Sequence, residues 1–381
     1  MLRRPLNLRR ILVTVDAVGG VWRYAVDVAR GMAGAGVSVV LVGSGPPPSP
    51  AQRREVDAIP GGALDWLDAP LDWMAGDASE LAGVPRLLAA ATERHSADLL
   101  HLNTPVQAVG LPVGLPFVVV SHSCVHTWWQ AVRSGAAPAE WGWRHDMTRA
   151  GFDAARLTLA PTASHARALV EAYGKIGGLK IVPNAAAPAA AAQPKEPFVF
   201  AAGRWWDEGK NGRVLDEAAG KTAWPIVMAG AVEGPLGQRF AATGARMLGP
   251  LDAAAVRAEM ARAAVFAAPS LYEPFGLAVL EAALSRAALV LADIPTFREL
   301  WGGAALFAAP RDPAAFARAI DALASDESLR RDLGARARTR AASFTIERQT
   351  TLLMEAYAGA MAGAASGRCD TRQPEFAEVS P

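Results

Sequence analysis

The sequence predicts an α/β protein of two domains, each built on a parallel sheet, and three observations support this. Short apolar runs alternate with helix-length amphipathic segments along most of the chain, as in βαβ units whose sheet is covered on both faces. The length of 381 residues suits two or three domains at about 150 residues each. Residues 185–197, rich in alanine and proline, interrupt the alternation and are typical of a linker.

Short runs of apolar residues mark the expected strands. They lie at 11–15, 37–42, 99–102, 117–120, 157–160, 180–182, 198–202, 225–229, 264–267 and 288–291. Helices are expected at 21–33, 211–219, 253–263, 275–285, 313–324, 327–343 and 346–361.

These elements divide the chain into consecutive parts. We expect a first domain at 1–184, the linker at 185–197, a second domain at 198–345, a separate final helix at 346–362 and a flexible tail at 363–381. Ligands of open α/β sheets bind beyond the carboxyl ends of the strands, so the chemistry should lie between the two sheets.

Composition excludes several classes of function. The 38 basic and 37 acidic residues leave a net charge of +1, so no overall field attracts nucleic acid or anionic lipid. Two cysteines, Cys124 and Cys369, exclude a disulfide framework and a four-thiolate zinc site. No run is long and apolar enough to span a membrane, and the basic start lacks the apolar core of a signal peptide. We expect a cytoplasmic protein with at most peripheral membrane contact through Arg3, Arg4, Arg9 and Arg10, which otherwise form a solvated terminus.

The most informative segment is 269–282, in which a loop carrying Glu273 follows a strand. Pro274 suits the first position of a helix. Free backbone N–H groups at such a helix start favour an anionic ligand such as phosphate. The groups expected there belong to Phe275, Gly276 and Leu277.

Glu281 follows Glu273 by eight residues, the pattern E-x7-E. A wholly helical interval would rise about 12 Å, which exceeds the roughly 5 to 9.5 Å between paired glycosidase carboxylates. Such a spacing suits two ends of one extended ligand, such as a nucleotide-sugar. An ordinary helix with one solvated glutamate is the alternative.

A second cluster, residues 202–211, follows the first expected strand of the second half. Arg204 and Lys210 can converge on one diphosphate, the former as a fork and the latter as a point charge. The alternative is a basic surface loop neutralised by Asp207 and Glu208. The chain contains no Asp-x-Asp, so we expect neither a metal nor another cofactor.

In the first half, His122 follows an expected strand and stands near Cys124 and His126 without an evident fourth metal ligand. A metal site is therefore not expected. Trp128 and Trp129 follow closely, and their ring faces can stack on a sugar in an acceptor cleft or simply fill space beside the sheet.

Taken together, the motifs resemble the family 4 glycosyltransferases of the GT-B fold over residues 10–362. The conjunction is more specific than any one motif. The matching segments are Asp16-Ala17-Val18-Gly19-Gly20, Pro116 with His122, residues 160–165, Val182-Pro183-Asn184, Gly203-Arg204 with Lys210, Leu248-Gly249-Pro250-Leu251, residues 269–282, Asp293-Ile294-Pro295-Thr296 and residues 307–313.

The resemblance implies two Rossmann-like domains facing each other across a cleft, with the final helix crossing back to the first domain. It implies catalytic roles for Glu273 and His122 toward the transferred sugar and for Arg204 and Lys210 on the diphosphate. Further donor contacts are implied for Glu281 on the ribose, Phe275, Gly276 and Leu277 near phosphate and sugar, Leu251 beside the base, and Gly19 and Gly20 near the donor phosphate.

The implied activity is retaining, metal-independent transfer of a sugar from a nucleotide diphosphate-sugar to an acceptor hydroxyl. The acceptor would be a sugar or a lipid-linked sugar, as in glycan, glycolipid or exopolysaccharide biosynthesis. A phosphorylase or nucleotide-sugar epimerase on the same scaffold remains open, as does a non-catalytic sugar-nucleotide-binding protein. No nucleic-acid partner is expected, and the sequence leaves the oligomeric state open.

Overall fold

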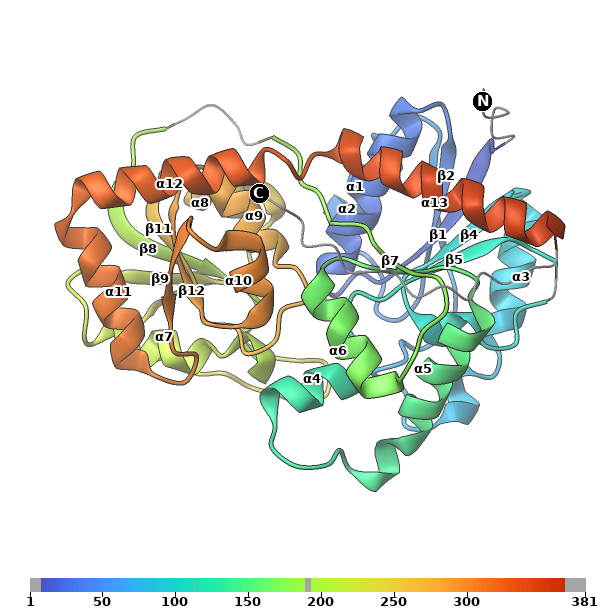
Figure 1. The fold of residues 1–381 in the computed structure, drawn as a ribbon, viewed down its shortest axis with the longest axis horizontal. Coiled ribbons are helices and arrows are strands. Elements are labelled where there is room, and N and C mark those ends of the chain that lie inside the picture. Colours follow the sequence, from blue (N-terminus) through green and yellow to red (C-terminus); the bar gives the residue numbers. More distant parts are fainter. Residues whose placement is uncertain (1–7, 113, 189–192, 367–381) are drawn as a thin grey trace. The chain divides into compact units, whose positions relative to one another are not determined.

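The computed structural model describes residues 8–112, 114–188 and 193–366, and these form two compact units (Figure 1). Unit 1 draws its described residues from 8–130, 135–184 and 346–366. Unit 2 comprises residues 131–134 and the described part of 185–345. Each unit has its own parallel sheet, which confirms the predicted fold class of two Rossmann-like α/β domains.

Unit 1 contains a seven-stranded parallel sheet in the order β3-β2-β1-β4-β5-β6-β7. The strands are β1 (Arg10–Val15), β2 (Ser38–Gly43), β3 (Gly62–Trp66), β4 (Leu99–Leu102), β5 (Phe117–Val120), β6 (Thr158–Ala160) and β7 (Leu179–Ile181). The helices are α1 (Gly20–Gly34), α2 (Pro50–Asp57), α3 (Val84–His95), α4 (Val125–Val132), α5 (Gly142–Ala154), α6 (Ala163–Tyr173) and α13 (Ile346–Ser366).

Alternation along β1 shows how this sheet is covered on both faces. Ile11 and Val13 point into one apolar cluster with α1 and α13, whereas Leu12 belongs to another cluster on the opposite face. Burial on both faces explains why the strand reads as a continuous apolar run.

The final helix α13 lies beside α1 (Figure 1) and completes the first of these clusters with Leu353 and Tyr357, both fully buried. Gly31 of α1 permits this approach, because a Cβ there would lie 2.0 Å from Oγ1 of Thr350. Segments far apart in sequence therefore share one core.

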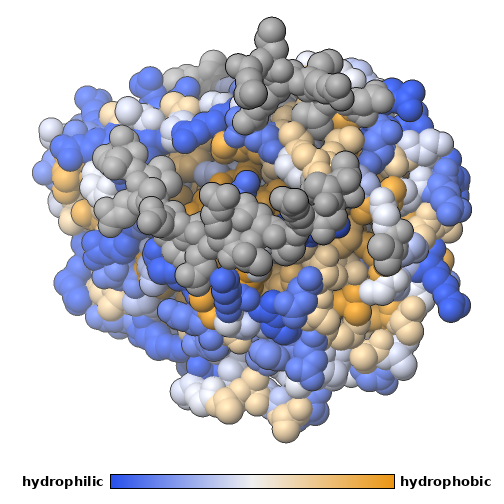
Figure 2. Space-filling model, turned by 45° about the vertical axis from the view of Figure 1, so that its right-hand side comes forward, coloured by the Kyte–Doolittle hydropathy of each residue, from blue (hydrophilic) through white to orange (hydrophobic). Residues whose placement is uncertain are grey.

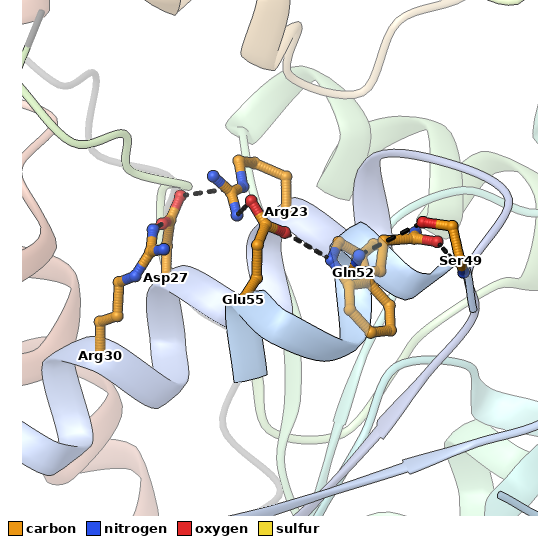
Figure 3. Close-up of polar contacts among 7 residues, drawn as sticks. Arg23, Asp27, Arg30, Ser49, Gln52 and Glu55 are labelled. Atoms are coloured by element: carbon orange, nitrogen blue, oxygen red, sulfur yellow. Dashed lines mark hydrogen bonds and ion pairs between the residues drawn. The ribbon is translucent and has the colours of Figure 1, made fainter. Parts of the chain in front are cut away.

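Figure 3 shows how charged residues join α1 to α2. Arg23 Nη2 donates to Glu55 Oε1 at 3.2 Å, and Trp22 Nε1 donates to Glu55 Oε2 at 3.0 Å. Arg23 and Arg30 also pair with Asp27. Burial raises the pKa of Asp27 despite these two arginines. The network therefore joins α1 to α2 around a buried carboxylate, while Arg30 remains exposed.

Unit 2 contains a six-stranded parallel sheet in the order β10-β9-β8-β11-β12-β13. The strands are β8 (Glu196–Ala202), β9 (Ile226–Ala229), β10 (Arg246–Gly249), β11 (Ala263–Ala268), β12 (Ala288–Ala292) and β13 (Ala305–Ala308). The helices are α7 (Gly212–Ala219), α8 (Ala253–Arg262), α9 (Leu277–Leu284), α10 (Pro295–Trp301), α11 (Pro313–Ser325) and α12 (Glu327–Ala341).

The segment between the two sheets differs from the predicted linker at both ends. Ala185 and Ala186 are buried, and β8 already begins at Glu196. The small side chains of these alanines allow packing where a linker was expected in preference to a packed element. Residues 189–192 of the predicted linker lie outside the described residues.

The end of the chain also differs from expectation. Helix α13 continues to Ser366, four residues beyond the predicted end at 362, because alanine-rich sequence sustains a helix well. The rest of the predicted tail, residues 367–381, lies outside the described residues, as do Arg3 and Arg4.

Among the described residues, large apolar side chains are seldom exposed. Figure 2 shows one face with hydrophilic residues around its margin and hydrophobic residues toward its middle. Over the described ranges, Leu87 and Leu236 are the large apolar residues classed as exposed. None of the helices in the described ranges combines the length and apolarity that a bilayer crossing requires.

Candidate functional site

Two strand ends bring the predicted charged residues of unit 2 together. Strand β8 pairs directly with β11, so the loops that follow them leave the same edge of the sheet. The loop after β8 carries Arg204 and Lys210, and the loop after β11 carries Glu273. The sheet order therefore joins two motifs that are separated in sequence.

The central contact at this edge is an ion pair between Lys210 and Glu273. Nζ of Lys210 lies 2.5 Å from Oε2 of Glu273, and both side chains are largely buried. Oγ of Ser270 lies 3.4 Å from the same carboxylate oxygen. The family resemblance implies that these two charges contact different parts of one ligand, whereas in the structure they contact each other.

Arg204 lies in the same loop but has its own partner. Its Nη2 atom is 3.4 Å from Oδ2 of Asp207, and its guanidinium lies 5.5 Å from the ring centre of Trp206. The side chain is 36% exposed. This weak, solvent-accessible pairing leaves the guanidinium accessible to a phosphate-bearing ligand.

Asn211 holds the two loops in register, a function that the sequence analysis did not assign to it. Its Nδ2 donates to the carbonyl oxygens of Pro269, at 2.9 Å, and Pro310, at 2.7 Å. The backbone N–H of Leu271 donates to the carbonyl of Gly209 at 2.8 Å. Asn211 itself has a left-handed backbone, with φ of 56°, a conformation that asparagine tolerates well.

Helix α9 begins later than predicted. Gly276 has φ of 90° and precedes the first helical residue, Leu277. Because this left-handed backbone cannot continue a right-handed helix backward, the prediction of Pro274 at the first helical position is wrong. Phe275 is buried against Phe344, so the free amides of the first turn begin at Leu277 rather than at Phe275.

Gly276 is tightly enclosed. An added Cβ would lie 3.1 Å from Cε1 of Phe297 and 3.3 Å from Cγ of Glu273. Glu281 lies within α9 and is partly buried. Since the helix covers only part of the interval from Glu273 to Glu281, the wholly helical rise assumed from the sequence does not apply.

The predicted base-contacting loop follows β10. Leu251 is partly buried and packs on the core of unit 2. Gly249 has φ of 70°, and its carbonyl accepts the N–H of Gly230 at 2.8 Å, which joins the ends of β9 and β10.

Asp216 of α7 organises the neighbouring loop and was not singled out in the sequence. Its carboxylate accepts the backbone N–H groups of Thr243, Gly244 and Ala245. Burial alone would raise the pKa of Asp216, but these hydrogen bonds outweigh it and lower the pKa. Asp216 lies on α7 and the loop it holds comes after β9, so no local sequence pattern indicates this contact.

In unit 1, the predicted glycine loop follows β1. Oδ1 of Asp16 accepts the N–H groups of Val18, at 2.8 Å, and Gly19, at 3.2 Å. Gly19 then caps α1 in an extended conformation, and Gly20 opens the helix. Gln52 of α2 steadies the loop because its Nε2 donates to the carbonyl of Ala17 at 3.1 Å.

His122 lies just after β5 and is partly buried. Its Nε2 is 2.9 Å from Oδ1 of Asn103, and its ring contacts that of Tyr24 edge-on at 4.3 Å. Burial is the main cause that lowers the pKa of His122 to about 3, and the nearby rings of His101 and His165 contribute to the same shift. The imidazole is therefore neutral at pH 7.

The two tryptophans predicted for the acceptor cleft lie on α4. Trp129 packs edge-on against Trp141 at 5.2 Å and donates from Nε1 to the carbonyl of Gly135 at 3.2 Å. Trp128 is partly buried on the same helix. These contacts fit the alternative in which Trp129 fills space beside the sheet. Stacking of Trp129 on a sugar stays a prediction.

Cys124 and His126 are engaged in contacts within unit 1. The thiol of Cys124 contacts the hydroxyls of Thr127 and Tyr173, and burial raises the pKa of this thiol. The ring of His126 packs against His145 at 5.0 Å. Within the described part of the chain, no three His, Cys, Asp or Glu side chains are gathered as a metal site requires.

Two family models match the sequence. One, described as Glycosyltransferase Family 4, matches residues 18–189, and the other, described as Glycosyl transferases group 1, matches residues 196–326. The boundary between them falls between β7 and β8, where one sheet ends and the other begins. No curated protein matched the sequence.

Solved structures resemble the chain over nearly its whole length. Sucrose-phosphate synthase from Thermosynechococcus elongatus gives a TM-score of 0.76 at 17% identity, covering 93% of this chain and 100% of its own. HepE from Anabaena, solved with UDP-glucose, gives a TM-score of 0.69 at 16% identity, and the match covers 92% of this chain and 99% of HepE. A glycosyltransferase from Rickettsia africae gives a TM-score of 0.69 at 16% identity, and the match covers 93% of this chain and 99% of that protein. At these identities the likeness shows the fold, which is GT-B.

Proposed function

Since the chain belongs to the family 4 glycosyltransferases and has the GT-B fold, we propose that it transfers a sugar with retention of configuration. The donor is a nucleoside diphosphate-sugar bound by unit 2, and the acceptor is a hydroxyl of a sugar or lipid-linked sugar bound by unit 1. The observation that carries the proposal is the pairing of Lys210 with Glu273, beside Arg204 and the start of α9.

Charge at this edge suits a diphosphate. Lys210 is held by Glu273, and Arg204 is partly exposed, so a bound diphosphate would gain a fixed point charge and a fork. The first-turn amides of α9 add partial positive charge without a metal ion. Glu281 is proposed to hold the ribose hydroxyls and Leu251 to contact the base.

The reaction is proposed to proceed on one face of the donor sugar. The bond between the anomeric carbon and the diphosphate oxygen breaks, and a bond to the acceptor oxygen forms on the same face. The leaving diphosphate oxygen takes the acceptor proton. Arg204, Lys210 and the α9 amides stabilise the charge that develops on the diphosphate.

The nucleotide in HepE, UDP-glucose in one of its structures, indicates where to begin a search for the donor. Thermal-shift measurements against UDP, GDP, ADP and their sugars should single out one nucleotide. Glu281→Ala should abolish that shift, while Glu217→Ala, on the exposed face of α7, should retain it. No shift with any nucleotide would refute the donor assignment.

Product analysis tests the chemistry. Proton NMR of the transferred sugar should show the donor's anomeric configuration, and activity should persist in EDTA. An inverted product would overturn the retaining proposal. Activity lost in EDTA and restored by a divalent ion would overturn the metal-free one.

A further inference from the structure

A chain of buried polar side chains runs through the core of unit 1 to His122, and none of its inner members was assigned a role above. It starts on α13 and crosses the carboxyl ends of β4 and β1. Its members, in order of contact, are Tyr357, His101, Asn103 and Thr14, with Tyr24 of α1 beside His101. All five are at least nine-tenths buried.

The orientation of Asn103 is set by Thr14. Nδ2 of Asn103 donates to the carbonyl of Thr14 at 2.5 Å, and its backbone N–H donates to the Thr14 hydroxyl at 2.8 Å. That hydroxyl in turn donates to Gln107 Oε1 at 2.7 Å. Since the amide nitrogen is committed to a carbonyl, Oδ1 of Asn103 is an acceptor facing the other way.

This oxygen faces two imidazole nitrogens. It lies 2.9 Å from Nε2 of His122 and 3.2 Å from Nε2 of His101. An amide oxygen can only accept, so each Nε2 must carry a proton. Nδ1 of His101 then accepts the hydroxyl proton of Tyr357, at 2.7 Å, and Nε2 of His101 also lies 3.2 Å from the Tyr24 hydroxyl.

The groups around His122 favour its uncharged form. Burial lowers the pKa of His101 to about 4 and that of His165 to about 4, and it raises those of Tyr24 and Tyr357 above their ordinary value. The ionisable neighbours acting on His122 are therefore neutral at pH 7. With Nε2 protonated, a neutral His122 has its lone pair on Nδ1.

We propose that Asn103 is a positioning residue that fixes the proton of His122 on Nε2, so that Nδ1 is presented as the acceptor for a hydroxyl of the bound sugar. His101, which is itself held by the Tyr357 hydroxyl, donates to the same amide oxygen and keeps the arrangement in place. The fixed tautomer concerns the protein alone, whereas its use toward a sugar rests on the proposed function.

The tautomer is tested without substrate. Long-range 1H–15N NMR of the whole protein at pH 7 should show His122 protonated on Nε2. In Asn103→Leu, which removes the acceptor, the Nδ1-protonated form should appear. Nδ1 protonation in the wild type, or an unchanged spectrum in Asn103→Leu, overturns the proposal whether or not the protein transfers sugar.

Kinetics test the positioning role. Asn103→Leu should lower kcat by about 10²-fold, as misplacement of a reacting group does, with the donor KM unchanged. Asn103→Asp keeps an acceptor oxygen but adds negative charge, which favours the imidazolium form. Asn103→Asp should therefore recover kcat at high pH and lose it as the pH falls. The kcat of the wild type should show no such fall over the same pH range.

A stability control separates positioning from folding. Leu353→Ala leaves a cavity in the same core, on α13 but outside the polar chain, and should lower Tm without changing the His122 tautomer or the pH profile. If Leu353→Ala reduces kcat as much as Asn103→Leu does, the loss reflects stability and the positioning role is refuted.

Discussion

The strand ends of the two units are built from opposite chemistry. In unit 2, the edge after β8 and β11 holds the Lys210–Glu273 ion pair and a partly exposed Arg204. In unit 1, the edge after β4 and β5 holds neutral imidazole and amide groups joined by hydrogen bonds. One edge is organised by charge, and the other by burial of uncharged donors and acceptors.

The difference teaches where binding and specificity should reside. At unit 2, Glu273 orients the ammonium of Lys210 but also neutralises it. The partly exposed Arg204 and the first-turn amides of α9 supply the remaining positive potential that an anionic ligand requires. A neutral, fully satisfied network offers directed hydrogen bonds without attracting a charged ligand. This contrast supports the proposed placement of a diphosphate at unit 2 and of a polyol at unit 1.

Removing the cation should give the largest effect. Lys210→Ala should lower kcat by roughly 10² to 10³-fold, since one preorganised charge partner of the leaving group is lost. Arg213→Ala, two residues into α7 and largely exposed, is the control and should retain activity. Steady-state kinetics provide the measurement, and near-wild-type turnover in Lys210→Ala would mean that charge does not organise this edge.

The neutral edge makes a second prediction, on pH. Burial lowers the pKa of His165 from 6.5 to about 4. Between these two pH values the histidine is largely protonated in the unfolded chain and largely neutral in the folded one. The stability from this histidine is complete above pH 6.5 and is lost progressively as the pH falls toward about 4. At pH 5 the loss should be about 2 kcal/mol.

Calorimetry of the wild type and His165→Gln between pH 7 and pH 5 measures this loss. The variant should lose correspondingly less stability over that interval, whatever its absolute Tm. Parallel pH profiles for the two proteins would show that His165 is not held neutral by burial.

A smaller effect is expected at the glycine before α9. Gly276→Ala should cost roughly 1–2 kcal/mol, because alanine disfavours its left-handed backbone, and its Cβ would press on Glu273. Gly359→Ala within α13, where a Cβ meets no neighbouring atom, should instead stabilise by about 0.5–1 kcal/mol. Thermal unfolding compares the two, and equal signs would argue against strain at Gly276.

The smallest effect concerns the glycine loop of unit 1. Gln52→Glu keeps an oxygen for the N–H of Ser49, as in the capping box of α2 (Figure 3), but loses the donor to Ala17. The lost hydrogen bond should cost about 1 kcal/mol and lower kcat/KM by a few-fold. Ser49→Ala removes the cap and spares the contact between Gln52 and Ala17. A loss of kcat/KM confined to Ser49→Ala would therefore contradict a role of that contact in activity.

The sequence predicted the fold best where burial is complete. Strands β11 and β12 are apolar throughout, β1 is apolar apart from Arg10 and the buried Thr14, and all three were located within a residue or so. Strand β3 was not predicted because its short sequence is half-exposed and contains an aspartate. Helix α2 was not predicted because Pro50 follows other prolines, although it occupies the first turn after the Ser49 cap.

The candidate site was predicted in composition but not in connection. Arg204, Lys210 and Glu273 were identified from local motifs. The pairing of Lys210 with Glu273, however, depends on β8 lying beside β11, which is a long-range fact. Asn103 was not singled out, although it follows strand β4 directly. The rule that ligands lie beyond the carboxyl ends of parallel strands would have drawn attention to it.

Helix α13 has a consequence for how the chain acquires its structure during synthesis. The sheet and helices of unit 2, from β8 to α12, form one continuous segment that can fold as soon as it leaves the ribosome. The core of unit 1, in contrast, lacks Leu353 and Tyr357 until α13 emerges. Until then the α13-facing surface of α1 is exposed to water. The half that is made first is thus the half that is finished last.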